Sequence, residues 1–188
     1  MLNRITDEIS PDELVECYIL TQKNLEHVCF KLKKISIYIW QVISRMKLSD
    51  NFIREFQDTM DWHGVSGIHL LNENFIRVFI NKIDWESVSK FQSLYEEFIR
   101  LYKDKMPWKW TSRYQNLSGD FIREFRDKVD WKSISKYQRI SENLIREFQV
   151  SVDWEAISKF QDLSMDFIRE FQDKVDWGLT SQNQDLSI

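Results

Sequence analysis

The hydrophobic positions of this chain fall into short helical stretches that recur along the sequence. Between Leu117 and Val129, apolar side chains repeat so that they share one stripe at 100° per residue, as in a helix that faces a core. The stripe consists of Leu117, Phe121, Ile122, Phe125 and Val129. The pattern predicts a helix of roughly 10 residues, about 15 Å long.

Polar residues mark where each predicted helix begins. Ser118 stands where an N-cap belongs, and Asp120 follows in the first turn, where the helix dipole favours a carboxylate. Asp130 restarts the pattern and is expected to cap a second, shorter helix of roughly 8 residues, about 12 Å long. The inward-facing side chains of that helix are expected to be Trp131, Ile134 and Tyr137.

Tryptophan recurs every 23 residues and sets the length of a repeat. The tryptophans are Trp62, Trp85, Trp108, Trp131, Trp154 and Trp177, and we expect them to form the structural core of the repeats. A fixed period in this range is typical of stacked repeat proteins, because a hairpin of two short helices buries its apolar face only against a neighbour. We therefore predict an all-α fold: a short-repeat α-solenoid of stacked two-helix hairpins, with six copies in residues 48–188.

Residues 1–47 match the repeat poorly and are predicted to form an N-terminal helical cap of degenerate repeats. The stretch "NLEHVCFKL", residues 24–32, echoes "DWEAISKFQ", residues 153–161, with leucine in place of the tryptophan. An alternative is an F-box-like adaptor that recruits ubiquitin-ligase machinery. It rests on Pro11, Glu13 and Leu14, which resemble the opening of an F-box, although the spacing to the next matching residues is too short.

The repeated unit "LSxDFIREFxDKVDWxxISKYQ" resembles a tandem repeat found in uncharacterised proteins of giant DNA viruses. The resemblance covers residues 48–188. It implies a viral origin and a repeat fold, and it transfers no activity and no catalytic residue. The copy at residues 94–115 departs most from the unit, with Pro107 in place of aspartate and Tyr95 in place of serine.

Three of the four positions that are identical in all six copies are explained by packing. Tryptophan and one isoleucine are assigned to the core, and a serine in the second helix permits close approach of helices. The serine hydroxyl is expected to bond a carbonyl one turn earlier. The isoleucines are Ile53, Ile76, Ile99, Ile122, Ile145 and Ile168; the serines are Ser66, Ser89, Ser112, Ser135, Ser158 and Ser181.

The fourth identical position is an arginine that lies nearly opposite the apolar stripe. The arginines are Arg54, Arg77, Arg100, Arg123, Arg146 and Arg169. With helices 8–10 Å apart they would form a ladder about 40–50 Å long. In a structural role, an aspartate four residues on would pair with Arg54, Arg100, Arg123 and Arg169. Arg77 and Arg146 lack that aspartate and would reach the aspartate before the tryptophan of a neighbouring copy. The alternative is a ladder that faces a partner, and the sequence leaves both open.

Charge is unevenly distributed along the chain, whose formal net charge is −4. Residues 100–139 carry 11 Lys and Arg against 5 Asp and Glu, whereas acidic residues dominate residues 48–99 and 140–188. Within this basic centre, Lys105, Lys109, Trp110 and Arg113 are candidate partner-binding residues, since exposed aromatics beside cations often anchor binding. The alternative is that these lysines only solvate the surface.

The sequence offers no pattern for catalysis, a cofactor or a metal. His63 and His69 are six residues apart, which does not suit a metal pair on one helix, and Cys17 and Cys29 lack a CxxC spacing. No signal-peptide pattern and no membrane span occurs, so an intracellular location is expected, in the host cytoplasm or the virion.

Together these patterns predict a non-enzymatic scaffold that binds a protein partner. A structural, self-assembling repeat protein is the main alternative, and the negative net charge disfavours nucleic acid.

Overall fold

A computed structural model describes residues 37–183, and in this range it contains 13 helices and no strand. The first four are α3 (Ile37–Ile43), α4 (Asp50–Glu55), α5 (Trp62–Ile68) and α6 (Glu73–Val78). They are followed by α7 (Trp85–Phe91), α8 (Glu96–Leu101), α9 (Trp108–Tyr114), α10 (Gly119–Glu124), α11 (Trp131–Tyr137), α12 (Glu142–Glu147), α13 (Trp154–Phe160), α14 (Met165–Glu170) and α15 (Trp177–Asn183). No helix among them is long and apolar enough to span a membrane.

The chain divides into two compact units, Met1–Asp84 and Trp85–Ile188. The boundary predicted between residues 47 and 48 stays a prediction. Several other predicted features lie outside residues 37–183: the F-box-like opening at residues 11–14, the degenerate repeat at residues 24–32 and the two cysteines.

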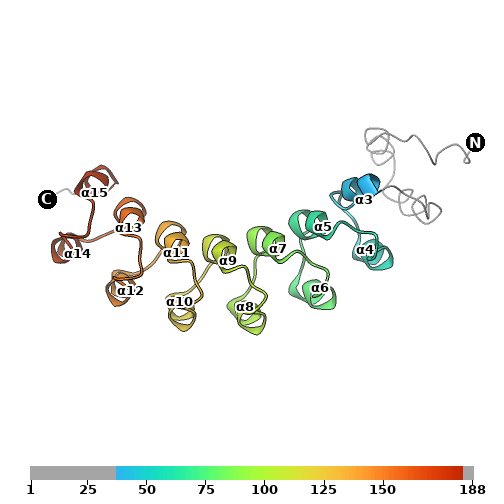
Figure 1. Cartoon of the computed structure of the whole chain (residues 1–188), viewed down its shortest axis with the longest axis horizontal. Coiled ribbons are helices and arrows are strands. Elements are labelled where there is room, and N and C mark those ends of the chain that lie inside the picture. The colour runs from blue at the N-terminus through green and yellow to red at the C-terminus, as the bar shows by residue number, and fades with distance from the viewer. Residues whose placement is uncertain (1–36, 184–188) are drawn as a thin grey trace, which may run out of the picture. The chain divides into compact units, whose positions relative to one another are not determined.

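The second unit is an α-solenoid with the predicted 23-residue repeat, in which each repeat adds one helix to each of two rows (Figure 1). We call α8, α10, α12 and α14 the first-helix row, and α7, α9, α11, α13 and α15 the second-helix row. Within the second-helix row, α9 packs between α7 and α11, and α13 packs between α11 and α15. This arrangement confirms the predicted fold class.

The predicted helix starts are confirmed by capping bonds. The Ser118 hydroxyl accepts from the N–H of Phe121 at 3.1 Å and begins α10, and an Asp130 carboxylate oxygen accepts from the N–H of Ser133 at 3.0 Å and begins α11. Such caps satisfy N–H groups that have no partner within the helix and contribute about 1 kcal/mol each. The starts of α10 and α11 are therefore encoded locally in the sequence.

The helices are shorter than predicted. Helix α10 has 6 residues and α11 has 7, against the expected 10 and 8. The apolar stripe runs on past α10, but the backbone there forms turns, with the N–H of Lys128 bonded to the Phe125 carbonyl at 2.8 Å. The stripe is buried as predicted, because these turns keep Phe125 and Val129 pointing to the same side as the helix.

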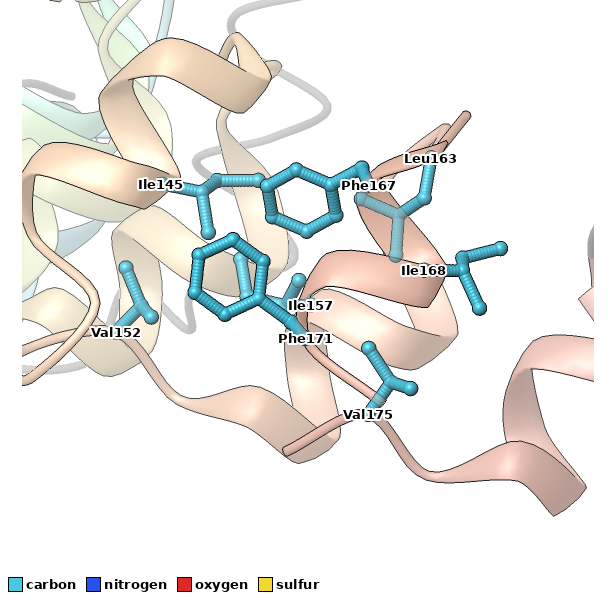
Figure 2. Packing of buried hydrophobic residues seen from close by; sticks show 8 residues of the cluster. All are labelled: Ile145, Val152, Ile157, Leu163, Phe167, Ile168, Phe171 and Val175. Atoms are coloured by element: carbon cyan, nitrogen blue, oxygen red, sulfur yellow. The ribbon is translucent and has the colours of Figure 1, made fainter. Parts of the chain in front are cut away.

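The core interleaves apolar side chains of successive repeats. Figure 2 shows one such cluster, in which residues of α12 and α13 and their turns meet residues of α14 and its following turn. Its members are Ile145, Val152, Ile157, Leu163, Phe167, Ile168, Phe171 and Val175. Burying one such side chain stabilises the fold by about 1.5–3 kcal/mol. Each hairpin thus depends on its neighbour for its stability.

The repeated tryptophans lie at the edge of this core, which corrects the prediction that they form it. Trp131 is half-buried and Trp177 is 51% exposed. The Trp131 indole N–H donates to the Arg126 carbonyl at 3.0 Å, and its ring lies 4.7 Å from that of Phe148 in the next repeat. The same indole bond is formed by Trp62, Trp108, Trp154 and Trp177. The repeat therefore uses tryptophan for the hydrogen bond from its indole N–H as well as for the apolar area of its ring.

The repeated serine links successive second helices. The N–H of Asp130 donates to the Ser112 hydroxyl at 2.9 Å, one repeat earlier. The Ser158 hydroxyl in turn donates to the Trp154 carbonyl at 2.7 Å, which confirms the predicted bond one turn back. Equivalent inter-repeat bonds join Asp84 to Ser66, Asp153 to Ser135 and Asp176 to Ser158.

A buried glutamine at the end of α9, α11 and α13 forms a connection that the sequence did not reveal. Gln138 donates through Nε2 to the carbonyls of Ser112 and Gln115 at 2.9 and 2.8 Å, and its Oε1 accepts from the N–H of Leu117 at 3.2 Å. Gln115 and Gln161 repeat these bonds. Each glutamine thereby satisfies buried backbone groups of the preceding repeat.

In the first unit, the residues at the serine and glutamine positions depart from the regular repeat. The N–H of Asp61 donates to the Ser44 hydroxyl at 2.8 Å, so α3 takes the place of a preceding second helix. The two residues are 17 apart, whereas the later pairs are 18 apart. His69 stands in the glutamine position and its Nε2 lies 3.2 Å from the Ser44 carbonyl. Helix α3 is therefore a degenerate copy, shifted by one residue.

Candidate interaction surface

Three of the four repeated arginines of the first-helix row are engaged between repeats. Arg123 Nε donates to Glu147 Oε2 of the next repeat at 2.7 Å, and Arg123 Nη1 donates to Asp120 of its own helix at 2.9 Å. Equivalent inter-repeat bonds run from Arg100 to Glu124 and from Arg146 to Glu170. Each of these two guanidiniums also lies over a phenylalanine ring of the next repeat, at 5.0 and 4.9 Å.

Neither partner predicted for the arginines is the one found. Two of the aspartates four residues on pair with lysines instead: Asp104 accepts from Lys128 of the next repeat at 2.9 Å, and Asp58 accepts from Lys82. The arginine reaches a glutamate 24 residues on because stacking places successive first helices side by side.

These pairs perturb ionisation in the expected direction. The hydrogen bond to Glu124 raises the pKa of Arg100, and bonds to Glu147 and Glu170 likewise raise the pKa of Arg123 and Arg146. The hydrogen bond from Lys128 lowers the pKa of Asp104. All of these groups lie near solvent, where water and salt screen such pairs, so each pair contributes little to stability.

The remaining arginines also have contacts. Arg54 lies over Phe75 at 5.6 Å, Arg77 pairs with Glu73 at 3.7 Å, and Arg169 pairs with Asp166 at 3.1 Å. The geometry therefore favours the structural interpretation of the arginine position over the one in which it faces a partner.

The second-helix row exposes aromatic side chains that sequence reasoning did not single out. Each of the helices α7, α9, α11 and α13 ends in one. They are Phe91, Tyr114, Tyr137 and Phe160, exposed by 61, 47, 41 and 46%. Tyr137 was predicted to point inward, and this is wrong because Ile134 and the glutamines fill the space beneath the helix. The sequence signal that could have revealed these exposed aromatics was a basic residue directly followed by an aromatic one, because this pair recurs every 23 residues.

A basic side chain precedes each of these aromatics and continues the row to the next repeat. Arg113 lies over its neighbour Tyr114 at 5.1 Å and over Tyr137 of the next repeat at 4.5 Å. Lys136 lies 5.2 Å from both Tyr137 and Phe160. We call this alternation of Arg113, Tyr137, Lys136 and Phe160, with Tyr114 and Lys159 at its ends, the cation–aromatic ladder.

The predicted basic-aromatic centre joins this ladder. Trp110 is half-buried and stacks on Tyr114 with 6.0 Å between ring centroids, and the Lys90 and Lys109 ammonium groups lie over its ring at 3.8 and 5.4 Å. Lys105 lies apart from them, in the turn between α8 and α9. The structure thus brings Lys109, Trp110 and Arg113 together on one helix and leaves Lys105 out.

The two rows of the second unit carry opposite charge. Helices of the second-helix row hold six Lys and Arg against two Glu, whereas helices of the first-helix row hold four Arg against eight Asp and Glu. Figure 1 shows the rows on opposite sides of the unit. An acidic partner would therefore be attracted to the second-helix row, and a basic partner to the first-helix row.

Residues 37–183 contain no cluster of three or more His, Cys, Asp or Glu side chains that suits a metal ion. His63 pairs with Asp84 at 2.7 Å, and His69 is buried against Ser44.

Because it exposes the cation–aromatic ladder, we take the second-helix row as the candidate site. No family model, curated protein or solved structure matches the chain.

Proposed function

We propose that this chain is a non-enzymatic repeat scaffold that binds a protein partner, and that the second-helix row of residues 85–183 is its binding face. The observation that supports this is the cation–aromatic ladder. Large aromatic side chains that contribute little to the core, set beside cations, are enriched where proteins bind one another. The arginines of the first-helix row, engaged between repeats, become part of the framework.

The viral origin and the intracellular location belong to this proposal. Both rest on the sequence, the origin on the resemblance of the 23-residue unit to repeats of giant DNA viruses. The F-box-like adaptor function of residues 1–47 rests on residues 11–14, which lie outside the described residues, and it stays an alternative prediction.

Affinity purification with mass spectrometry from cells that express the chain tests the scaffold function. The test variant carries Arg113→Glu and Lys136→Glu, and the matched control carries Lys103→Glu and Arg126→Glu. All four side chains are polar and near the surface, and the control pair lies in the turns between helices. We expect a partner that is captured by the parent and the control and lost by the test variant. Recovery of no partner by any of the three proteins would reject the scaffold function.

Self-assembly is the second candidate, and the opposite charge of the two rows supports it. Because both rows have the same repeat, an acidic row of one molecule would match a basic row of another at every repeat. Sedimentation at low and high salt tests this function. A monomer at all concentrations at low salt would reject it.

A further inference from the structure

The cations of the ladder differ from those of the first-helix row in how their charge is balanced. Arg113, Lys136 and Lys159 form no ion pair within the part of the chain that the structure describes. In contrast, Arg100, Arg123 and Arg146 each meet a carboxylate of the next repeat at 2.7–2.8 Å. Among the described residues, the second unit therefore pairs these arginines with carboxylates on one side and leaves the three cations of the ladder unbalanced on the other, where Lys90 of α7 does pair with Glu86.

The aromatic side chains beside these cations are not needed to fill the core. Tyr137 is 41% exposed while Ile134 of the same helix is fully buried. A polar side chain at the end of α11 would leave the core unchanged, yet an aromatic stands at this position in α7, α9, α11 and α13. A surface on which aromatic and basic side chains alternate suits a ligand on which apolar and acidic groups alternate.

The spacing of the ladder limits the shape of that ligand. Packed helices lie 8–10 Å apart, so successive cations recur at about that distance. An extended polypeptide in the polyproline II conformation advances about 3.1 Å per residue with three residues per turn, so every third side chain lies on the same side, about 9 Å apart. Carboxylates at every third position of such a segment would therefore meet one cation in each repeat.

We propose that the cation–aromatic ladder binds an extended, acidic polypeptide segment with a carboxylate at about every third residue and apolar side chains between. This assignment rests on the proposed scaffold function and specifies its partner. The carboxylates pair with Arg113, Lys136 and Lys159, and the apolar side chains pack on the exposed parts of Tyr114, Tyr137 and Phe160.

A single-stranded nucleic acid fits the ladder less well. Bases bind such surfaces by stacking on aromatic faces. Here the Arg113 guanidinium already lies over the Tyr137 ring at 4.5 Å and the Lys136 ammonium lies 5.2 Å from the Phe160 ring centre. The ladder offers only one cation in each repeat, whereas binding of a nucleic acid depends on many cations along its phosphate backbone.

Fluorescence anisotropy with a designed peptide tests the assignment. The probe is a labelled peptide of about 18 residues with aspartate at every third position and leucine and glycine between. The control peptide has the same composition with its aspartates consecutive. We expect the periodic peptide to bind about ten-fold more tightly than the consecutive one, and added salt to weaken it. Equal affinities would overturn the assignment, because they would indicate attraction by net charge alone.

Variants of the chain separate charge from aromatic contact. The pair Arg113→Glu with Lys136→Glu is expected to abolish binding of the periodic peptide, while Lys103→Glu with Arg126→Glu leaves it within about two-fold. The pair Tyr137→Ser with Phe160→Ser keeps the charge and should lower the affinity about ten-fold. Circular dichroism confirms that each variant is folded. Unchanged binding by the serine pair would overturn the assignment.

Two further outcomes would also overturn it. Oligothymidylate of similar length that binds more tightly than the periodic peptide would indicate nucleic acid, and a dimer that is lost in the Arg113 and Lys136 variant would indicate a second copy as the occupant. If partners are captured from cells but do not depend on the ladder, the scaffold function stands and this assignment fails. If the peptide binds as expected and no cellular partner is captured, the ladder chemistry stands and the scaffold function fails.

Discussion

Arg123 and Glu147 join the first helices of two successive repeats, with Arg123 Nε donating to Glu147 Oε2 at 2.7 Å. The two side chains are 39 and 45% exposed, so water screens the pair. It therefore contributes little to the free energy of unfolding by itself, and its recurrence in Arg100 and Arg146 acts mainly to set how neighbouring first helices align.

Replacing Arg123 by alanine is expected to lower the free energy of unfolding only slightly, and its coupling to Glu147 in a double-mutant cycle to be small and favourable, because water screens the pair. Urea denaturation at low salt measures both values. Arg123→Glu should cost more, because it adds repulsion from Glu147, and Glu147→Arg in the same chain should restore most of the loss. A coupling of zero would contradict an inter-repeat role.

Gln138→Ala is expected to lower the free energy of unfolding by about 3 kcal/mol, because it leaves two buried carbonyls and one N–H without their partner. Hydrogen exchange gives a local measure, since the N–H of Leu117, which donates to Gln138 Oε1, should exchange faster. The control is Gln172→Ala, at an exposed side chain in the turn before α15, where only a small change is expected. Equal effects of the two substitutions would show that the buried glutamine bonds are not stabilising.

Pro107→Asp is expected to stabilise the second unit by about 1 kcal/mol. Proline at this position has no N–H, and the Ser89 hydroxyl lies 3.5 Å from the Thr111 hydroxyl instead. Aspartate restores both the side-chain cap found at Asp130 and the N–H bond to the preceding serine, and these gains exceed the entropy advantage of proline in the unfolded chain. The thermal midpoint should rise by a few degrees, and Ser89→Ala in the same chain should remove part of the gain.

The first unit should lose stability as the pH falls through about 6.5. Burial lowers the pKa of His69, and its bond to the Ser44 carbonyl and the charge of Asp50 oppose this shift only in part. The unfolded chain therefore binds a proton at a higher pH than the folded chain does, so the stability present above pH 6.5 is lost on acidification.

His69→Gln isolates this effect, because glutamine holds the equivalent position in the second unit and does not titrate. Urea midpoints between about pH 8 and pH 5.5 should fall in the parent and stay flatter in the variant, and His63 is kept in both proteins. Parallel pH profiles would show that His69 is protonated equally in the folded and unfolded chains.

The errors of the sequence prediction have a common origin. The caps at Ser118 and Asp130 are correct because each bonds a backbone N–H only three residues away. The partner of Arg123 is wrong because the prediction looked four residues along one helix, whereas the partner lies 24 residues away across a stacking contact. Gln138 was missed for the same reason, since a polar residue at a helix end suggests exposure until the neighbouring repeat is in place.

By itself, the amino-acid sequence determined the helical class, the 23-residue repeat and the start of each helix, because apolar spacing and capping act within one hairpin. The tertiary structure decided which polar groups are satisfied. Stacking carries the arginines to glutamates and the glutamines to carbonyls of an adjacent repeat, and it leaves the aromatic and basic ends of the second helices exposed. Which side chains find a partner in the next repeat and which stay exposed depends on the distance between neighbouring helices, and no single repeat specifies that distance.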